Sequence, residues 1–359
     1  MVINVGLRYD QFDPESAYPS DRRNPANQLI LPDSMMSLYP QAPVISQISP
    51  RVGFAYQLGG QAVLHFSYGH FFQMPPMYAM YENNSFLVDP NNFVTRMGNT
   101  LLEPEKTITY EIGLWQELNQ VMALDVALFY RDIYNLLTTK TISTYNQVKY
   151  GLYSNKDYGN VRGLELKLDL AMGQLKGMVN YTLQYTRGNA DSPGQTFDRA
   201  GNNQDPVNRL IPMGWDQRHT LNGSLIYGTE KYGGSMTAYY NSGSPYTFAP
   251  QSESVLSRIN LYPNNDYRPE KYSVDCSFYY RFKLPGGYNA NLDVNIYNLF
   301  DRLNEEWVND QTGRAYTAVI KETDIAGHRS DFNDYEDRIK NPSMYSSPRM
   351  VKIGIGFNF

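Results

Sequence analysis

The sequence has little cysteine, little histidine and no long apolar run. No window of its 359 residues approaches 18 consecutive apolar residues, which excludes a transmembrane helix. Cys276 is the only cysteine, so the chain forms no internal disulfide. The formal net charge is -5 and no basic stripe is present, so the sequence does not support nucleic-acid binding.

Tyrosine is abundant. The chain has 31 Tyr and 14% aromatic residues, yet its mean hydropathy is -0.51. This pairing suits a structure that spreads its apolar surface over every second residue and places aromatic rings along two membrane interfaces.

Apolar and polar residues alternate strictly in many segments, which is the period of a β-strand with different surroundings on its two faces. In GLELKLDL (163–170), four leucines share one face and the ionic residues share the other. We predict twelve strands, at 2–10, 50–58, 61–72, 105–118, 120–142, 150–172, 174–188, 216–229, 231–243, 270–284, 287–301 and 347–359.

The predicted connections alternate between short turns and longer loops. Short turns fall at 58–61, 117–120, 171–175, 228–234 and 284–288. This arrangement is typical of an outer-membrane β-barrel with short periplasmic turns and long extracellular loops. It predicts an all-β, antiparallel transmembrane barrel with a periplasmic C-terminus. A soluble sandwich or propeller is the weaker alternative, because several predicted strands are longer than the usual five or so residues.

The final strand ends on an aromatic residue. Its apolar face resembles the signal by which the outer-membrane assembly machinery recognises barrels, and consists of Val351, Ile353, Ile355, Phe357 and Phe359. The alternative is an ordinary soluble edge strand, which would invite aggregation.

No catalytic motif is present. The four histidines are His65, His70, His219 and His328, and neither GxSxG, HExxH nor CxxC occurs. We therefore predict a protein that is not an enzyme, with no catalytic residue, no cofactor and no metal. The acidic stretch 331–338 lacks the spacing of a calcium loop, so a solvated loop is favoured.

Two small groups of residues are candidates for ligand binding. Asp216, Arg218 and His219 stand together in WDQRH, where they would hold a polar or anionic ligand. Tyr246 and Phe248 in SGSPYTFAP would stack on a sugar or a chelate. Structural duties in the wall or loops are the commoner roles for both groups.

Several phrases, in order along the chain, resemble the TonB-dependent receptor family. They are SYGHFFQMPPMYAMY (67–81), LLEPEKTITYEIGL (101–114), ALFYRDIYNLL (127–137), NVRGLELKLDL (160–170), WDQRHTLNGSLIYG (215–228), NIYNLFDR (295–302) and the terminal GIGFNF. The resemblance implies residues 1–359 as a single barrel domain that is the C-terminal portion of a 22-stranded barrel around a plug.

The resemblance also implies energised uptake of a scarce nutrient, such as a siderophore, haem, cobalamin, a glycan or a peptide, across the outer membrane of a Gram-negative bacterium. Membrane lipid, the assembly machinery, a plug domain and TonB are the implied partners. The sequence shows no signal peptide, plug or TonB-binding segment, so we expect its natural N-terminus to be missing. The alternative is a passive channel or structural barrel that closes on twelve strands. Substrate and oligomeric state stay open.

Overall fold

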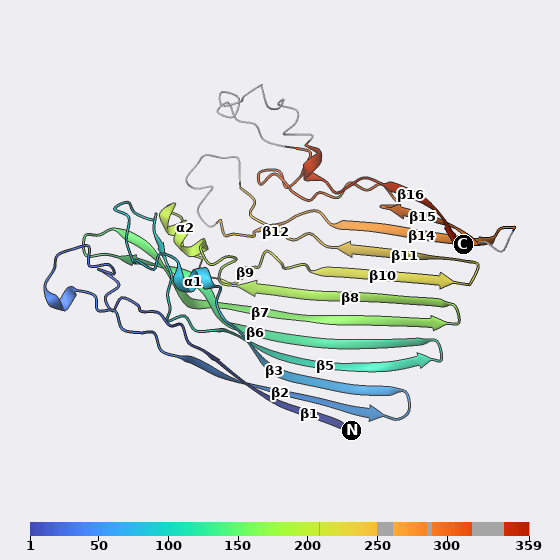
Figure 1. Cartoon of the computed structure of the whole chain (residues 1–359), viewed down its shortest axis with the longest axis horizontal. Coiled ribbons are helices and arrows are strands. Elements are labelled where there is room, and N and C mark those ends of the chain that lie inside the picture. The colour runs from blue at the N-terminus through green and yellow to red at the C-terminus, as the bar shows by residue number, and fades with distance from the viewer. Residues whose placement is uncertain (208, 250–260, 286–288, 318–340, 359) are drawn as a thin grey trace.

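The computed structural model describes residues 1–207, 209–249, 261–285, 289–317 and 341–358. Twelve antiparallel strands lie side by side in chain order in one curved sheet (Figure 1). They are β1 (Val2–Phe12), β2 (Ile45–Leu58), β3 (Ala62–Gln73), β5 (Glu105–Asn119), β6 (Met122–Ser143), β7 (Lys149–Met172), β8 (Leu175–Gly188), β10 (His219–Gly228), β11 (Tyr232–Asn241), β14 (Lys271–Lys283), β15 (Asn289–Tyr297) and β16 (Met350–Asn358). The twelve predicted strands are confirmed.

Short elements that alternation did not predict lie outside this path. β4 (Arg96–Met97) pairs in parallel with β7, and β9 (Ile211–Pro212) pairs with β8, which makes the sheet 14-stranded. β12 (Pro245–Tyr246) and β13 (Asp266–Tyr267) form a separate pair. The helical turns are α1 (Met77–Tyr81), α2 (Gln195–Gly201), η1 (Asp33–Met35) and η2 (Pro342–Met344).

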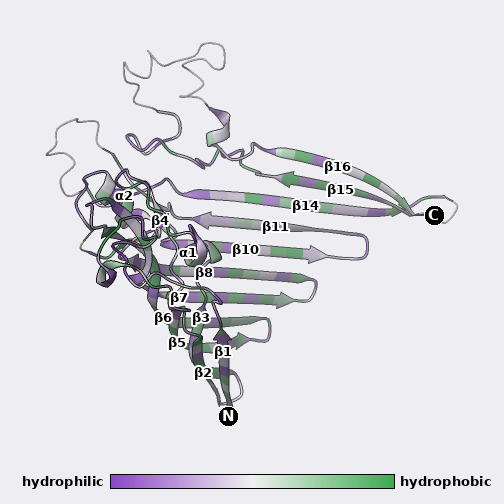
Figure 2. Ribbon diagram, turned by 60° about the vertical axis from the view of Figure 1, so that its left-hand side comes forward, coloured by the Kyte–Doolittle hydropathy of each residue, from purple (hydrophilic) through white to green (hydrophobic). Residues whose placement is uncertain are grey.

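The pleat gives the sheet two chemically different faces. Directly paired residues project to the same face, so the leucines of β7 join Leu124, Val126 and Leu128 of β6 on the convex side. Apolar side chains on this side are exposed: Val5 is 77% exposed and Ile353 is 70% exposed. The concave side carries the polar partners, such as Asp125 opposite Lys167. Figure 2 shows the resulting alternation of hydrophobic and hydrophilic residues along the strands.

Turns and loops lie at opposite ends of the sheet. Residues 59–61, 120–121, 173–174 and 229–231 make tight connections at one end, where both termini also lie (Figure 1). At the other end of the sheet, one connection is shorter than its neighbours. β6 and β7 are the longest strands, extend beyond the rest of the sheet, and are joined by residues 144–148. β2 begins at Ile45, five residues before the predicted start, because Pro50 is accommodated within the strand.

The loops at the other end pack into one layer around two apolar clusters. One contains Ala79, Met80, Leu102, Leu137 and Tyr153, and the second contains Val88, Met97, Tyr150 and Leu152. Tyr150 is fully buried and donates a 2.6 Å hydrogen bond to the carbonyl of Arg22. The loops at this end of the sheet are therefore folded against one another in the described part of the chain. No helix among the described residues is long and apolar enough to cross a membrane.

Candidate functional site

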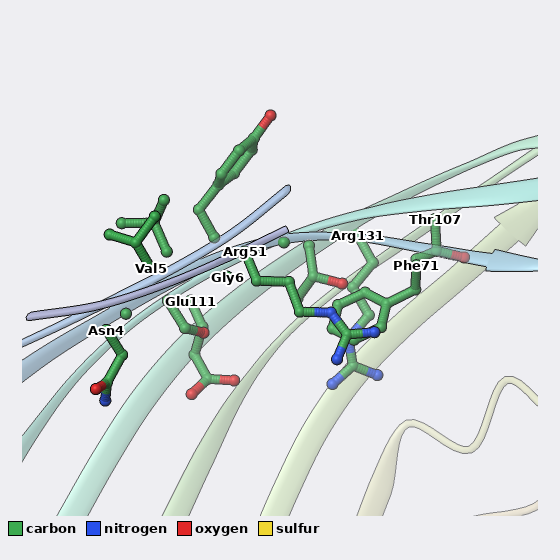
Figure 3. Close-up of a pocket in the computed structure, with 14 residues that line it drawn as sticks. Asn4, Val5, Gly6, Arg51, Phe71, Thr107, Glu111 and Arg131 are labelled. Atoms are coloured by element: carbon green, nitrogen blue, oxygen red, sulfur yellow. The ribbon is translucent and has the colours of Figure 1, made fainter. Parts of the chain in front are cut away.

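A hollow of about 750 Å³ lies against the first five long strands, β1, β2, β3, β5 and β6, where the polar face of the sheet is concave (Figure 3). Arg51 of β2 and Arg131 of β6 point into it, as do Asn4 and Glu111 (Figure 3). Its full lining is Asn4, Val5, Gly6, Arg51, Val52, Gly53, Ser67, Tyr68, Gly69, Phe71, Thr107, Thr109, Glu111 and Arg131. Three of these residues, Val5, Val52 and Tyr68, are paired with one another on the opposite, apolar face of the sheet.

A single row of paired residues forms the floor of this hollow. Gly6 pairs with Arg51, Arg51 with Gly69, Gly69 with Thr109, and Thr109 with Arg131. A side chain at Gly6 would meet no atom within 4 Å, whereas a Cβ at Gly69 would lie 3.1 Å from the ring of Phe71. Gly69 and Thr109 are therefore the small residues between the two arginines, Gly6 leaves space on the other side of Arg51, and Gly69 lets the Phe71 ring lie close to the sheet.

Both arginines rest on aromatic rings. The guanidinium of Arg51 lies 4.6 Å from the centre of Phe71, and that of Arg131 lies 4.7 Å from the centre of Phe129. Neither guanidinium forms an ion pair with another residue that the structure describes. The hollow thus presents two positive groups held by cation–π contacts, with Glu111 one row further along the strands.

The concave face also carries paired charges. His65 Nε2 lies 3.2 Å from Asp125 Oδ1, and Lys167 Nζ lies 3.0 Å from Asp169 Oδ2. Arg8 forms an ion pair of 2.7 Å with Asp10 on β1. These pairs neutralise the wall locally, whereas Arg51 and Arg131 form no ion pair with a described residue.

The structure brings Asp216 and Arg218 together but directs His219 elsewhere. Asp216 is fully buried: Oδ1 accepts a 2.7 Å bond from the Thr186 amide and Oδ2 a 3.0 Å bond from the Tyr267 hydroxyl. Arg218 donates a 2.8 Å bond to the same hydroxyl. This cluster ties the start of β10 to β8 and β13. Its carboxylate is occupied by protein partners.

His219 pairs with Leu183 on the apolar face and its ring lies 2.8 Å from the Tyr181 hydroxyl. His70 makes a similar 2.6 Å contact with Tyr68 on that face, which carries Phe66 and Leu64. Since successive residues of a strand project to opposite sides, Arg218 and His219 diverge. His328 and residues 331–338 lie outside the described part of the chain.

Tyr246 and Phe248 lie in the loop layer. Tyr246 is buried and donates a 3.2 Å hydrogen bond to Asp266, and the Phe248 amide donates to Asn265 at 2.7 Å. Burial, with the nearby charge of Asp266 and this hydrogen bond, raises the pKa of Tyr246 to about 12. The ring of Tyr246 therefore packs within the loops, and Phe248 is half-buried beside it.

The apolar face of β16 is open. Val351, Ile353, Ile355 and Phe357 are each more than half exposed, while Phe359 lies outside the described residues. No group of three or more His, Cys, Asp or Glu residues with the geometry of a metal site occurs in the described ranges.

Sequence reasoning did not single out Arg51, Arg131 or Tyr267. Each arginine is one of several polar residues on a strand in which apolar and polar residues alternate, so neither stands out. The two arginines are 80 positions apart in the chain. Their positions on the polar face follow from the alternation, but their shared hollow follows only from the order of four strands in the sheet.

A family model described as "TonB dependent receptor-like, beta-barrel" matches residues 2–299. Three solved structures are similar in fold. The copper transporter OprC is 13% identical with a TM-score of 0.52, covering 99% of this chain and 45% of that one. The outer membrane transporter YddB from Escherichia coli is 12% identical with a TM-score of 0.51, covering 75% and 40%.

The FrpB iron transporter from Neisseria meningitidis is 17% identical with a TM-score of 0.50, covering 84% of this chain and 39% of that one. The chain thus spans less than half the length of these structures. At such identities the likeness concerns the fold. No curated protein matches the sequence.

Proposed function

The chain belongs to the TonB-dependent receptor β-barrel family, and we propose that it forms part of the wall of an outer-membrane transporter that takes up a scarce nutrient. The observation that carries this proposal is the contrast between the faces of the sheet. Open apolar side chains such as Leu7, which is 72% exposed, need a hydrocarbon environment. The concave polar face suits a hydrated path.

The two edge strands of the sheet, β1 and β16, indicate that the complete wall has more strands than these twelve. Within the described residues β1 pairs only with β2, and β16 pairs only with β15. Unpaired backbone groups are costly in lipid, so a membrane barrel must close. We propose that further strands complete the wall between these edges, which makes this chain the C-terminal portion of the barrel.

The folded loop layer would meet the substrate first, and a plug inside the barrel, moved by TonB, would open the path. Under this proposal the loop end faces outward and the short turns, with the C-terminus, face the periplasm. Siderophores, haem, cobalamin, glycans and peptides are the substrate classes to be tested.

Energised uptake is the decisive measurement. A strain that lacks the gene should lose uptake of one solute from these classes, and the intact gene should restore it. A protonophore should abolish the restored uptake, because a TonB-dependent step draws on the proton gradient. Uptake that persists with the protonophore would favour the passive channel instead.

The last strand supplies a second test. We propose that its apolar face is read by the barrel assembly machinery during insertion. Phe359→Ala should lower the amount of protein in the outer membrane, whereas Lys352→Ala, on the polar face of the same strand, should leave it nearly unchanged. Equal insertion of both variants would contradict this role.

A further inference from the structure

We propose that Arg51 and Arg131 form a binding site on the luminal wall for a small organic solute with two or more negatively charged groups. This inference rests on the proposed transport function and deepens it, because it names the chemical class of the solute. The site has three parts: two cations, two aromatic supports, and a floor of small residues, Gly69 and Thr109, between the cations.

The spacing of the arginines fits an anion with separated charges. Arg51 lies on β2 and Arg131 on β6, with β3 and β5 between them. Three strand spacings place their backbones about 14 Å apart. Both side chains project from the same face of the sheet into one hollow (Figure 3). A solute that lies between them can meet both guanidinium groups at once.

Two guanidinium groups and one carboxylate, that of Glu111, line the hollow, so its net charge is positive, and neither arginine forms an ion pair with a described residue. Arg8 and Lys167 on the same face are paired with carboxylates at 2.7 and 3.0 Å, whereas no described residue pairs with either arginine of the hollow. Two like charges that share a hollow repel each other. Carboxylate groups of a solute would relieve this repulsion, and the planar guanidinium fork binds a carboxylate through two hydrogen bonds.

The hollow is organised before any solute arrives. Phe71 and Phe129 support the guanidinium groups by stacking, which lowers the entropy lost on binding. Gly69 and Thr109 are the small residues between the two arginines, and Gly6 leaves space on the other side of Arg51. The volume of about 750 Å³ lies within the range of roughly 300 to 1,000 Å³ usual for small-molecule sites. The hollow is therefore large enough for a small organic solute.

The position of the site also suits a transport path. The row that contains Arg131 continues to Val161 and Thr186, which are 2% and 1% exposed beneath the folded loops. The arginines thus lie at the level where the loop layer ends and the open concave wall begins. A solute released by the loops would meet them next.

Calorimetric titration of the intact protein, purified in non-ionic detergent, tests the site directly. The probe is benzene-1,3,5-tricarboxylate, and the neutral benzene-1,3,5-tricarboxamide is its matched control. Arg51→Gln and Arg131→Gln should each raise the Kd of the tricarboxylate about tenfold, since each removes a charge-assisted contact. Arg8→Gln removes the same charge from an arginine that already forms an ion pair with Asp10. This variant should change the Kd of the tricarboxylate less than about twofold.

Added salt should weaken binding of the tricarboxylate, because the contact is ionic. Absence of binding, equal affinity in all variants, or equal binding of the uncharged tricarboxamide would overturn the proposal. If a glutamine variant does not fold, Arg51→Lys and Arg131→Lys take its place. Lysine keeps the positive charge but cannot donate the two parallel hydrogen bonds of a guanidinium, so these variants should still weaken binding severalfold. The uptake assay with protonophore is independent of this titration, so failure of the site and failure of the transport function are distinguishable.

Discussion

The hydroxyl of Tyr267 donates a 3.0 Å hydrogen bond to Oδ2 of Asp216, a carboxylate with no solvent exposure. The same hydroxyl accepts a 2.8 Å bond from Arg218, so a single phenol bridges the buried acid and its neighbouring cation. This relationship joins two segments that are 51 positions apart. These hydrogen bonds anchor the segment that leads into His219, the first residue of β10. Loss of the bond between Tyr267 and Asp216 should therefore destabilise the packed loops.

Asp216→Asn should destabilise the folded protein by about 2 to 3 kcal/mol, because the buried charge and its bond to the tyrosine hydroxyl are lost while Arg218 stays in place. Urea unfolding in detergent measures the change. The matched variant is Asp169→Asn, whose carboxylate is 43% exposed and paired with Lys167, and it should cost less than about 1 kcal/mol. Equal costs would contradict a structural role for Asp216.

Leu168→Arg should cost about 2 to 4 kcal/mol if this residue faces hydrocarbon near the middle of the membrane. Leu168 pairs with Leu124 and Val179 on the convex face. Thr182→Arg is the control, because Thr182 pairs with Glu165 on the concave face. The free energy of unfolding in lipid vesicles gives the comparison. If both arginines are tolerated alike, the two faces are assigned wrongly.

Cys276 offers a test of whether the convex surface of the sheet faces lipid. It lies on β14 between Met236 and Ile296, its paired residues on the convex face. A fluorophore attached to Cys276 in reconstituted vesicles should be quenched strongly by brominated lipid and weakly by aqueous iodide. The adjacent position on the concave face, in the double variant Cys276→Ser and Ser277→Cys, should show the reverse. The same quenching pattern at both positions would refute the opposition of the faces.

Tyr246 should make stability depend on alkaline pH. Its pKa is raised from 10.0 to about 12, first by burial and then by Asp266. The folded state thus holds the proton more tightly than the unfolded state, so this contribution is complete below pH 10 and is lost as the pH rises through about 12. Urea unfolding of Tyr246→Phe should therefore show a flatter loss of stability between pH 10 and 12 than the unchanged protein. An identical pH profile would show that Tyr246 does not contribute.

Alternation alone located the twelve long strands because one face of each is mainly apolar and the other mainly polar. It failed for β4, β9, β12 and β13, which are two residues long and show no period. The prediction that Asp216, Arg218 and His219 form one group is wrong for His219. Its side chain projects to the opposite face of the sheet, beside Tyr181. The bond from Tyr267 to Asp216 had no local signal, since it depends on how a distant loop folds back.

The sequence by itself determined the strands, their faces and the tight turns, because all of these follow from the two-residue period and from local turn chemistry. Only the tertiary structure decided which polar residues meet. The convergence of Arg51 and Arg131 needs four strands in a fixed register, and the burial of Asp216 needs loops packed over the sheet. Such contacts join residues far apart in the chain, so no local pattern encodes them.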